Sequence, residues 1–202
     1  MTKSVDFYFD FASPNAYFAH KVLPSVCARY EAEIVLKPVL LGGIFRATNN
    51  QAPMVAFASV KGKVAYEMLE VQRFIARHQL SAFKMNSSFP VNTLMLMRAA
   101  MTFDDQDLLQ AFLNAGMRSM WELDRKMDDA VIFVRTLTEL GFDGAGLLAA
   151  TQDAAIKEAL KSATETAVAR GIFGLPTFFV GEEMFFGKER LGQVEDMLGG
   201  ER

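Results

Sequence analysis

The stretch FDFASPNAYFAHKVL, from Phe9 to Leu23, marks the place where a strand-like run changes into a helical one. The aromatic and β-branched residues of VDFYFDF, Val5 to Phe11, predict a buried strand. Ser13 and the proline after it form a helix-start signal, because serine caps free backbone amides and proline suits the first helical position. We therefore expect a helix from Ser13 to about Tyr30, with a kink or an early end at Pro24.

A second strand is predicted after this helix, in EIVLKPVLL from Glu33 to Leu41. Pro38 within it favours an edge position or a strand end, since proline cannot donate to a sheet ladder. A strand, a helix and a strand within about forty residues fit a parallel βαβ unit with a right-handed crossover. At the other end of the chain, TFFVG and EMFFG predict a hairpin, and KERLGQVEDMLG, Lys188 to Gly199, predicts a closing helix.

The middle of the chain, from about Gly43 to Gly171, carries helical patterns. They lie near 59–78, 92–101, 105–115, 118–126, 130–140 and 145–150, and from about Asp153 to Arg170. This order predicts an α/β protein, a thioredoxin-like fold with a large all-helical insertion. We expect residues 1–42 and 165–202 to form the thioredoxin-like domain and residues 43–164 to form the insertion.

Composition excludes several classes of function. A formal net charge of -3 gives no general attraction to nucleic acid. No apolar run reaches about 18 residues, so no membrane span is expected. The beginning of the chain lacks a secretory-signal pattern, and the single cysteine, Cys27, cannot form an internal disulfide, so we expect a cytoplasmic protein. His20 and His78 share no ligand spacing, and we expect neither to bind metal.

Ser13 has two interpretations. It is either a plain helix cap, or a catalytic residue at a helix start whose free amides and dipole attract an anion. Thioredoxin-like enzymes place a reactive cysteine at the corner where the first strand turns into the first helix, which is the position of Ser13 here. Here the corner holds no thiol, which excludes disulfide exchange there. The functional interpretation is therefore a hydrogen bond to a sulfur that a ligand brings.

Two later stretches add to this interpretation. In GIFGLPTFFV, Pro176 is either an ordinary strand-entrance proline or a cis proline that faces the Ser13 corner. In the second case Leu175 could pair with a peptide-like ligand as an added strand does, and glutathione is such a ligand. In FFGKERL, the charged residues either start a solvated helix or bind a ligand. The amides of Gly187, Lys188 and Glu189 could hold a carboxylate, and Glu189 could hold an ammonium group.

Taken together, FDFASPNAY, RATNNQAP, FPVN, RGIFGLPTFFV and FFGKERL resemble the family of kappa-class glutathione transferases and 2-hydroxychromene-2-carboxylate isomerases. The resemblance covers nearly the whole chain, and SPNAY is more similar to the bacterial isomerases. It implies that Ser13 bonds the glutathione sulfur and Leu175, before the cis Pro176, pairs with the glutathione backbone. The glutathione site then comprises Ser13, Asn50, Leu175, Pro176, Gly187, Lys188 and Glu189. Glu189 stands where the family usually has aspartate.

For the substrate, a small aromatic carboxylate, the resemblance implies binding by Phe45, Arg46, Lys63 and Asn86. From the residues alone, Asn86 has two possible roles, in structural capping or in lining a pocket. The implied activity is a glutathione-dependent isomerisation in aromatic (naphthalene) catabolism, by a homodimer. Two alternatives are a kappa-like glutathione transferase that acts on small electrophiles, and a thioredoxin-like module that binds peptides without catalysis.

Overall fold

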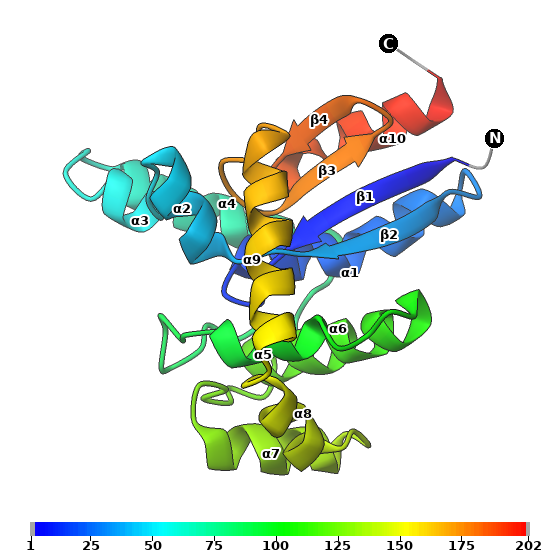
Figure 1. Ribbon diagram of the computed structural model, residues 1–202. Coiled ribbons are helices and arrows are strands. Elements are labelled where there is room, and N and C mark those ends of the chain that lie inside the picture. The colour runs from blue at the N-terminus through cyan, green and yellow to red at the C-terminus, as the bar shows by residue number, and fades with distance from the viewer. Residues whose placement is uncertain (1–2, 201–202) are drawn as a thin grey trace.

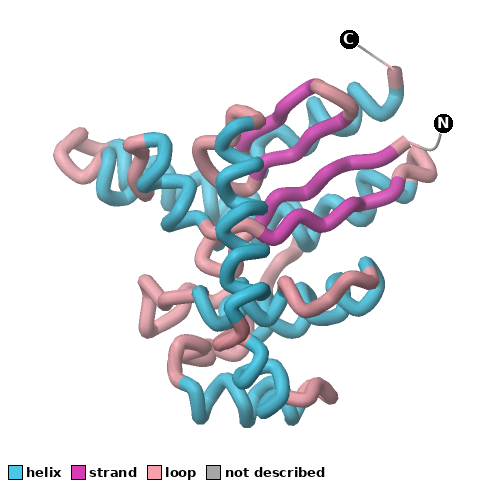
Figure 2. Tube along the Cα trace, in the orientation of Figure 1, coloured by secondary structure: helices cyan, strands magenta, loops and turns pink. Residues whose placement is uncertain are grey.

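The computed structural model describes residues 3–200. The chain folds as a four-stranded sheet with helices on both faces and a helical block beside it (Figure 1, Figure 2). In chain order the elements are β1 (Ser4–Phe9), α1 (Pro14–Ala28), β2 (Glu33–Pro38), α2 (Leu41–Thr48), α3 (Pro53–Ala56), α4 (Lys63–His78), α5 (Leu94–Ala100), α6 (Gln106–Trp121), α7 (Ala130–Glu139), α8 (Gly144–Ala150), α9 (Ala154–Ala169), β3 (Thr177–Val180), β4 (Glu183–Phe186), the 3-10 helix η1 (Lys188–Arg190) and α10 (Leu191–Gly199).

The sheet has the order β2-β1-β3-β4. β1 and β2 are parallel and joined through α1, which confirms the predicted βαβ unit. β3 runs antiparallel to β1, and β4 returns beside it as the predicted hairpin. This is a thioredoxin-like fold, and its helical insertion lies between β2 and β3 as the sequence predicts.

The two faces of β1 are covered by different helices, because successive side chains of a strand point to opposite sides. Val5, Phe7 and Phe9 belong to the main core together with buried residues of α1 and α10. Tyr8 belongs to a smaller cluster with Ala167 of α9. In Figure 1, α9 crosses the sheet near the carboxyl ends of β1 and β2.

The main core extends from the sheet into the helical block. Leu96 of α5, Phe112 of α6 and Phe133 of α7 are buried in the same cluster as the residues of β1. Trp121, at the end of α6, is buried and donates from Nε1 to the Phe11 carbonyl at 2.9 Å. The insertion and the thioredoxin-like part are therefore held together by continuous apolar packing and by this bond to the loop after β1.

Several predicted boundaries were wrong. The segments at 105–115 and 118–126 form one helix, α6, which ends at Trp121. Gly116 lies within this continuous helix, and its missing side chain leaves room for the ring of Phe11. The second strand ends at Pro38, and Leu41 already begins α2, whose start is held by Asp10.

Pro24 does not end α1, which continues to Ala28. Leu23, Val26 and Cys27 around it are buried, and this apolar packing holds the last turns in helical form despite the missing backbone donor. Within residues 3–200, no helix is long and apolar enough to cross a bilayer.

Candidate functional site

Ser13 lies at the N-cap of α1, in extended backbone conformation, and is only 4% exposed. Its Oγ accepts a hydrogen bond from the Ala16 amide at 3.1 Å, as an N-cap should. The same hydroxyl donates to the Leu175 carbonyl at 3.2 Å. Ser13 is therefore a helix cap and also the residue that joins the start of α1 to the loop before β3.

The Leu175-Pro176 peptide bond is cis, as the family resemblance implies. The Pro176 carbonyl accepts from the Gly187 amide at 2.9 Å, which brings the end of β4 to this loop. Gly187 has φ +94°, a conformation that glycine adopts without steric cost. Among residues 3–200 the Leu175 amide donates to no other group, so this backbone donor is available to a peptide-like ligand.

Asn50 reaches the same loop from the end of α2. Its Nδ2 donates to the Phe173 carbonyl at 2.8 Å, two residues before Leu175. Its Oδ1 accepts from the Gln51 amide, and the residue is exposed. Asn50 thus borders the corner formed by Ser13 and the cis-proline loop.

Lys188 and Glu189 lie in η1, directly after Gly187. Lys188 is 4% exposed, and its ammonium pairs with the Glu189 carboxylate and lies 5.3 Å from the centre of the Phe74 ring in α4. Burial of a lysine is costly unless the charge is paired, and Glu189 supplies the partner. The pair directly follows Gly187, whose amide bonds the Pro176 carbonyl, so it lies near the cis-proline loop.

Asp10 is a site residue whose role the sequence analysis missed. Its buried carboxylate accepts from the Ala12 amide at 2.9 Å, from the Leu41 amide at 2.8 Å and from the Thr93 hydroxyl at 2.6 Å. Burial raises the pKa of this carboxyl group, and the three donors act in the opposite direction. The signal in the sequence was a carboxylate at the end of an aromatic run, three residues before Ser13.

The residues expected to bind substrate do not form one cluster. Phe45 is half-buried and Arg46 exposed on α2, the helix that ends at Asn50. Lys63 begins α4, where its ammonium pairs with Glu67 at 2.6 Å and lies 5.2 Å from the centre of the Phe57 ring. The structure thus pairs Lys63 with a carboxylate of its own helix.

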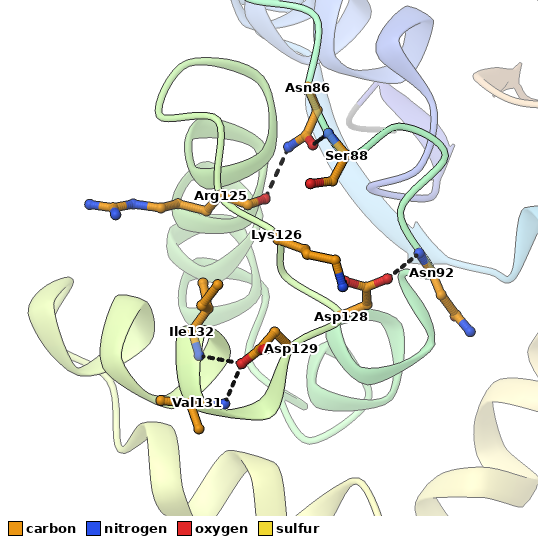
Figure 3. A network of polar contacts seen from close by, with 9 residues as sticks. All are labelled: Asn86, Ser88, Asn92, Arg125, Lys126, Asp128, Asp129, Val131 and Ile132. Carbon is orange, nitrogen blue, oxygen red and sulfur yellow. Dashed lines mark hydrogen bonds and ion pairs between the residues drawn. The ribbon is translucent and has the colours of Figure 1, made fainter.

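Asn86 is placed inside the fold. Its Nδ2 donates to the carbonyls of Met120 and Arg125 at 2.9 Å each, and its Oδ1 accepts from the Ser88 amide at 2.9 Å. Figure 3 shows the side chain directed at the Arg125 carbonyl and the Ser88 amide. Because the residue is 2% exposed and these bonds engage both ends of its amide, the geometry corresponds to the structural alternative.

The remaining groups offer no thiol or metal chemistry at the corner. Cys27 is buried on α1, and burial raises its pKa to about 11, so its thiol stays protonated and inert near neutral pH. Within the described residues, no group of three or more His, Cys, Asp or Glu side chains could hold a metal ion. The corner offers the capped start of α1, the Ser13 hydroxyl and the backbone amide of Leu175, which is unpaired among residues 3–200. These groups suit a peptide-like ligand that carries a sulfur.

The fold and the corner define a thioredoxin-fold protein with serine in place of the reactive cysteine. The chain belongs to the family of the DSBA-like thioredoxin domain, whose family model matches residues 4–199.

Among curated proteins, the chain is 28% identical to 2-hydroxychromene-2-carboxylate isomerase from Sphingobium xenophagum, over 98% of this chain and 99% of the relative. It is 22% identical to glutathione S-transferase kappa 1 from Rattus norvegicus, over 96% of this chain and 90% of the relative. Among solved structures, a 2-hydroxychromene-2-carboxylate isomerase superposes with a TM-score of 0.81 at 27% identity, covering 98% of this chain and 95% of that one. The resemblance seen in the sequence motifs is thereby confirmed.

Proposed function

We propose that this protein is a glutathione-dependent isomerase that interconverts 2-hydroxychromene-2-carboxylate and trans-o-hydroxybenzylidenepyruvate in aromatic (naphthalene) catabolism. The observation that carries the proposal is the 3.2 Å bond between the Ser13 hydroxyl and the Leu175 carbonyl beside the cis proline. It places a hydroxyl, a helix start and an unused backbone amide within one corner. The full-length similarity to isomerases of this name supports the choice of reaction.

Glutathione fits the groups that the corner presents. Its peptide backbone can pair with the free amide of Leu175, and its γ-glutamyl end can meet the charges of Lys188 and Glu189. Glu189 is one methylene longer than the usual aspartate, and its carboxylate pairs with the Lys188 ammonium. Asn50 closes the corner from α2 through its bond to Phe173.

The reaction needs a thiolate and no redox change. Bound glutathione would supply a sulfur nucleophile whose addition turns a double bond into a single bond that can rotate, before elimination releases the isomer. The chain contributes the Ser13 hydroxyl, which can turn from Leu175 toward sulfur, and the start of α1, whose dipole favours an anion. Ser13 itself is not the nucleophile, because among residues 3–200 only backbone groups hydrogen-bond its side chain and none is a base.

Aromatic carboxylate substrates are assigned to the region of α2 and α4, with Phe45, Arg46 and Lys63 as candidate contacts. Asn86 is proposed to act there only indirectly, by holding the loop after α6. A cytoplasmic location belongs to the proposal, because a reducing compartment keeps glutathione as a thiol. We also expect a homodimer, and a monomeric mass in light scattering at micromolar concentration would contradict that part.

The test combines binding and turnover. Glutathione should raise the melting temperature and bind saturably in calorimetry, and the isomerisation should stop when glutathione is removed. Turnover without glutathione, or no binding at all, would overturn the proposal; the second result would favour a non-catalytic module. Conjugation of glutathione to an aryl halide without isomerisation would instead identify a kappa-like transferase.

A further inference from the structure

A second concave region lies away from Ser13. A groove of about 520 Å³ opens between β1, β2 and α9, and its wall includes Asp6, Tyr8, Lys37, Val39, Ala163 and Arg170. Its volume falls within the roughly 300–1,000 Å³ of small-molecule sites. None of its lining residues belongs to the proposed glutathione site.

The groove lies on the face of the sheet opposite α1, the helix that Ser13 begins. Phe7 and Phe9 face the main core with α1, the helix that Ser13 begins. Asp6 and Tyr8, which alternate with them, face α9. The groove lies on this face, where β1 and β2 meet α9, and Figure 1 shows α9 crossing the sheet near the carboxyl ends of both strands.

Two hydrogen-bond donors stand side by side in the groove. Tyr8 and Lys37 are register partners on the parallel strands β1 and β2, so their side chains share this face. Tyr8 is 7% exposed, and its hydroxyl oxygen accepts from Arg170 at 3.1 Å, which leaves its hydrogen for another acceptor. Among residues 3–200, that hydrogen has no acceptor and the Lys37 ammonium forms no ion pair.

The other charges of the groove compensate each other. Arg170 pairs with the Asp6 carboxylate at 2.6 Å, donates to the Gly181 carbonyl and stacks on the Phe179 ring at 3.6 Å. Arg170 is thus fixed by the protein, and Asp6 is neutralised by it. The unpaired charge that remains is the positive one on Lys37, beside the free Tyr8 hydroxyl.

The rest of the lining is largely apolar, with Val39 and Ala163 beside the two donors. We propose that this groove binds a small organic carboxylate, with its two oxygens on the Tyr8 hydroxyl and the Lys37 ammonium and its apolar body against Val39 and Ala163. The donor pair matches the two acceptor oxygens of a carboxylate, and the apolar wall rejects a fully hydrated inorganic anion. None of the groups that would bind this carboxylate is assigned to glutathione.

The experiment is a titration of the ¹⁵N-labelled protein with benzoate, followed through the backbone amide signals. Benzoate should shift the signals of β1, β2 and α9 around the groove saturably, with Kd on the order of 1 mM, as its small size allows. Neutral benzamide should bind about tenfold more weakly, because it lacks the charge that Lys37 pairs with.

Variants localise the binding. Lys37→Met should weaken benzoate binding about tenfold, and Ala163→Phe, which fills the groove, should abolish it while circular dichroism shows the native fold. Lys84→Met, a lysine outside the groove, is the matched control and should bind as the wild type does. The absence of saturable shifts, shifts confined to the Ser13 corner, or equal affinity in Lys37→Met and wild type would each overturn the proposal.

Discussion

At the residue scale, Ser13 performs two tasks with one hydroxyl. As an acceptor it caps α1 through the Ala16 amide, and as a donor it bonds the Leu175 carbonyl. The first task concerns stability, whereas the second leaves a donor that can be redirected to a ligand sulfur without breaking the cap. The two contributions can therefore be measured separately.

Ser13→Ala should lower the free energy of unfolding by about 1 kcal/mol through the lost cap. It should also lower glutathione-dependent turnover about ten- to a hundredfold and raise the pKa of the bound thiol, because a charge-assisted bond is lost. The measurement is thiolate absorbance of the glutathione complex against pH, together with rates. Ser25→Ala, in the same helix with its hydroxyl on the Val22 carbonyl, is the matched control. Identical titration curves and full activity in Ser13→Ala would show that Ser13 caps the helix and does not bond the glutathione sulfur.

His20 is a second residue with a measurable effect, on the pH dependence of stability. Burial, followed by the charge of Lys21, lowers its pKa from 6.5 to about 4. The folded protein thus favours the neutral ring, whereas the unfolded chain takes up a proton more readily. The free energy of unfolding therefore keeps its full value above pH 6.5 and decreases as the pH falls toward 4. The expected loss is about 2 kcal/mol between about pH 7.5 and about pH 5.

Urea unfolding of wild type and His20→Gln at these two pH values tests this expectation. The variant should lose less stability on acidification, whatever its stability at neutral pH. His78→Gln serves as the control, because His78 is only half-buried and its pKa is less strongly perturbed. An equal acid loss in wild type and His20→Gln would show that other groups cause it.

At the scale of elements, α6 depends on a close approach to the loop after β1. A Cβ placed on Gly116 would lie 2.3 Å from the nearest carbon of the Phe11 ring. Phe11 and Gly116 are both buried, so the ring has little room to move. The packing of helix against loop, rather than helix propensity, explains glycine in the middle of this helix.

Gly116→Ala should therefore destabilise the protein by about 1–3 kcal/mol, although alanine is the better helix former. Gly192→Ala in α10 is the matched control, because a Cβ there meets nothing within 4 Å. That control should be neutral or stabilising by up to about 1 kcal/mol. Denaturant unfolding of both variants measures the difference, and a stabilised Gly116→Ala would contradict the packing argument.

At the scale of the whole molecule, Asp10 joins three parts of the fold. Its carboxylate binds the loop before Ser13, the first residue of α2 and Thr93 at the start of α5. These segments are far apart in the sequence. If they separated, the buried carboxylate would lose hydrogen-bond donors, and each lost donor would make its burial more costly in free energy. The helical insertion is thus connected to the corner by a polar contact as well as by apolar packing.

Thr93→Val removes one of these donors with little change of shape. It should lower the free energy of unfolding by about 1–3 kcal/mol, as expected when a buried acceptor loses a partner. Thr48→Val is the control, because the Thr48 hydroxyl bonds only to a carbonyl of its own helix. Equal effects of the two substitutions in denaturant unfolding would show that the hydrogen bond from Thr93 to Asp10 does not contribute measurably to stability.

Much of the architecture followed from local chemistry in the sequence. The alternation of aromatic strands, the Ser13 helix start and the hairpin near Pro176 depend on residues close in the chain, where propensity and turn chemistry act. The resemblance added the cis proline and the set of residues at the corner. The local pattern divided α6 wrongly at Gly116, because the reason for a glycine inside a continuous helix is the ring of Phe11, which is distant in sequence.

Contacts between distant segments were decided by the tertiary structure alone. No local pattern indicates that the carboxylate of Asp10 meets Leu41 and Thr93, or that Asn86 is turned inward to Met120 and Arg125. Nor does it show that Tyr8 and Lys37 stand beside each other across two strands. A side chain's own type sets what it can bond, but its partners are set by register and packing, which bring the segments together only when the whole chain folds.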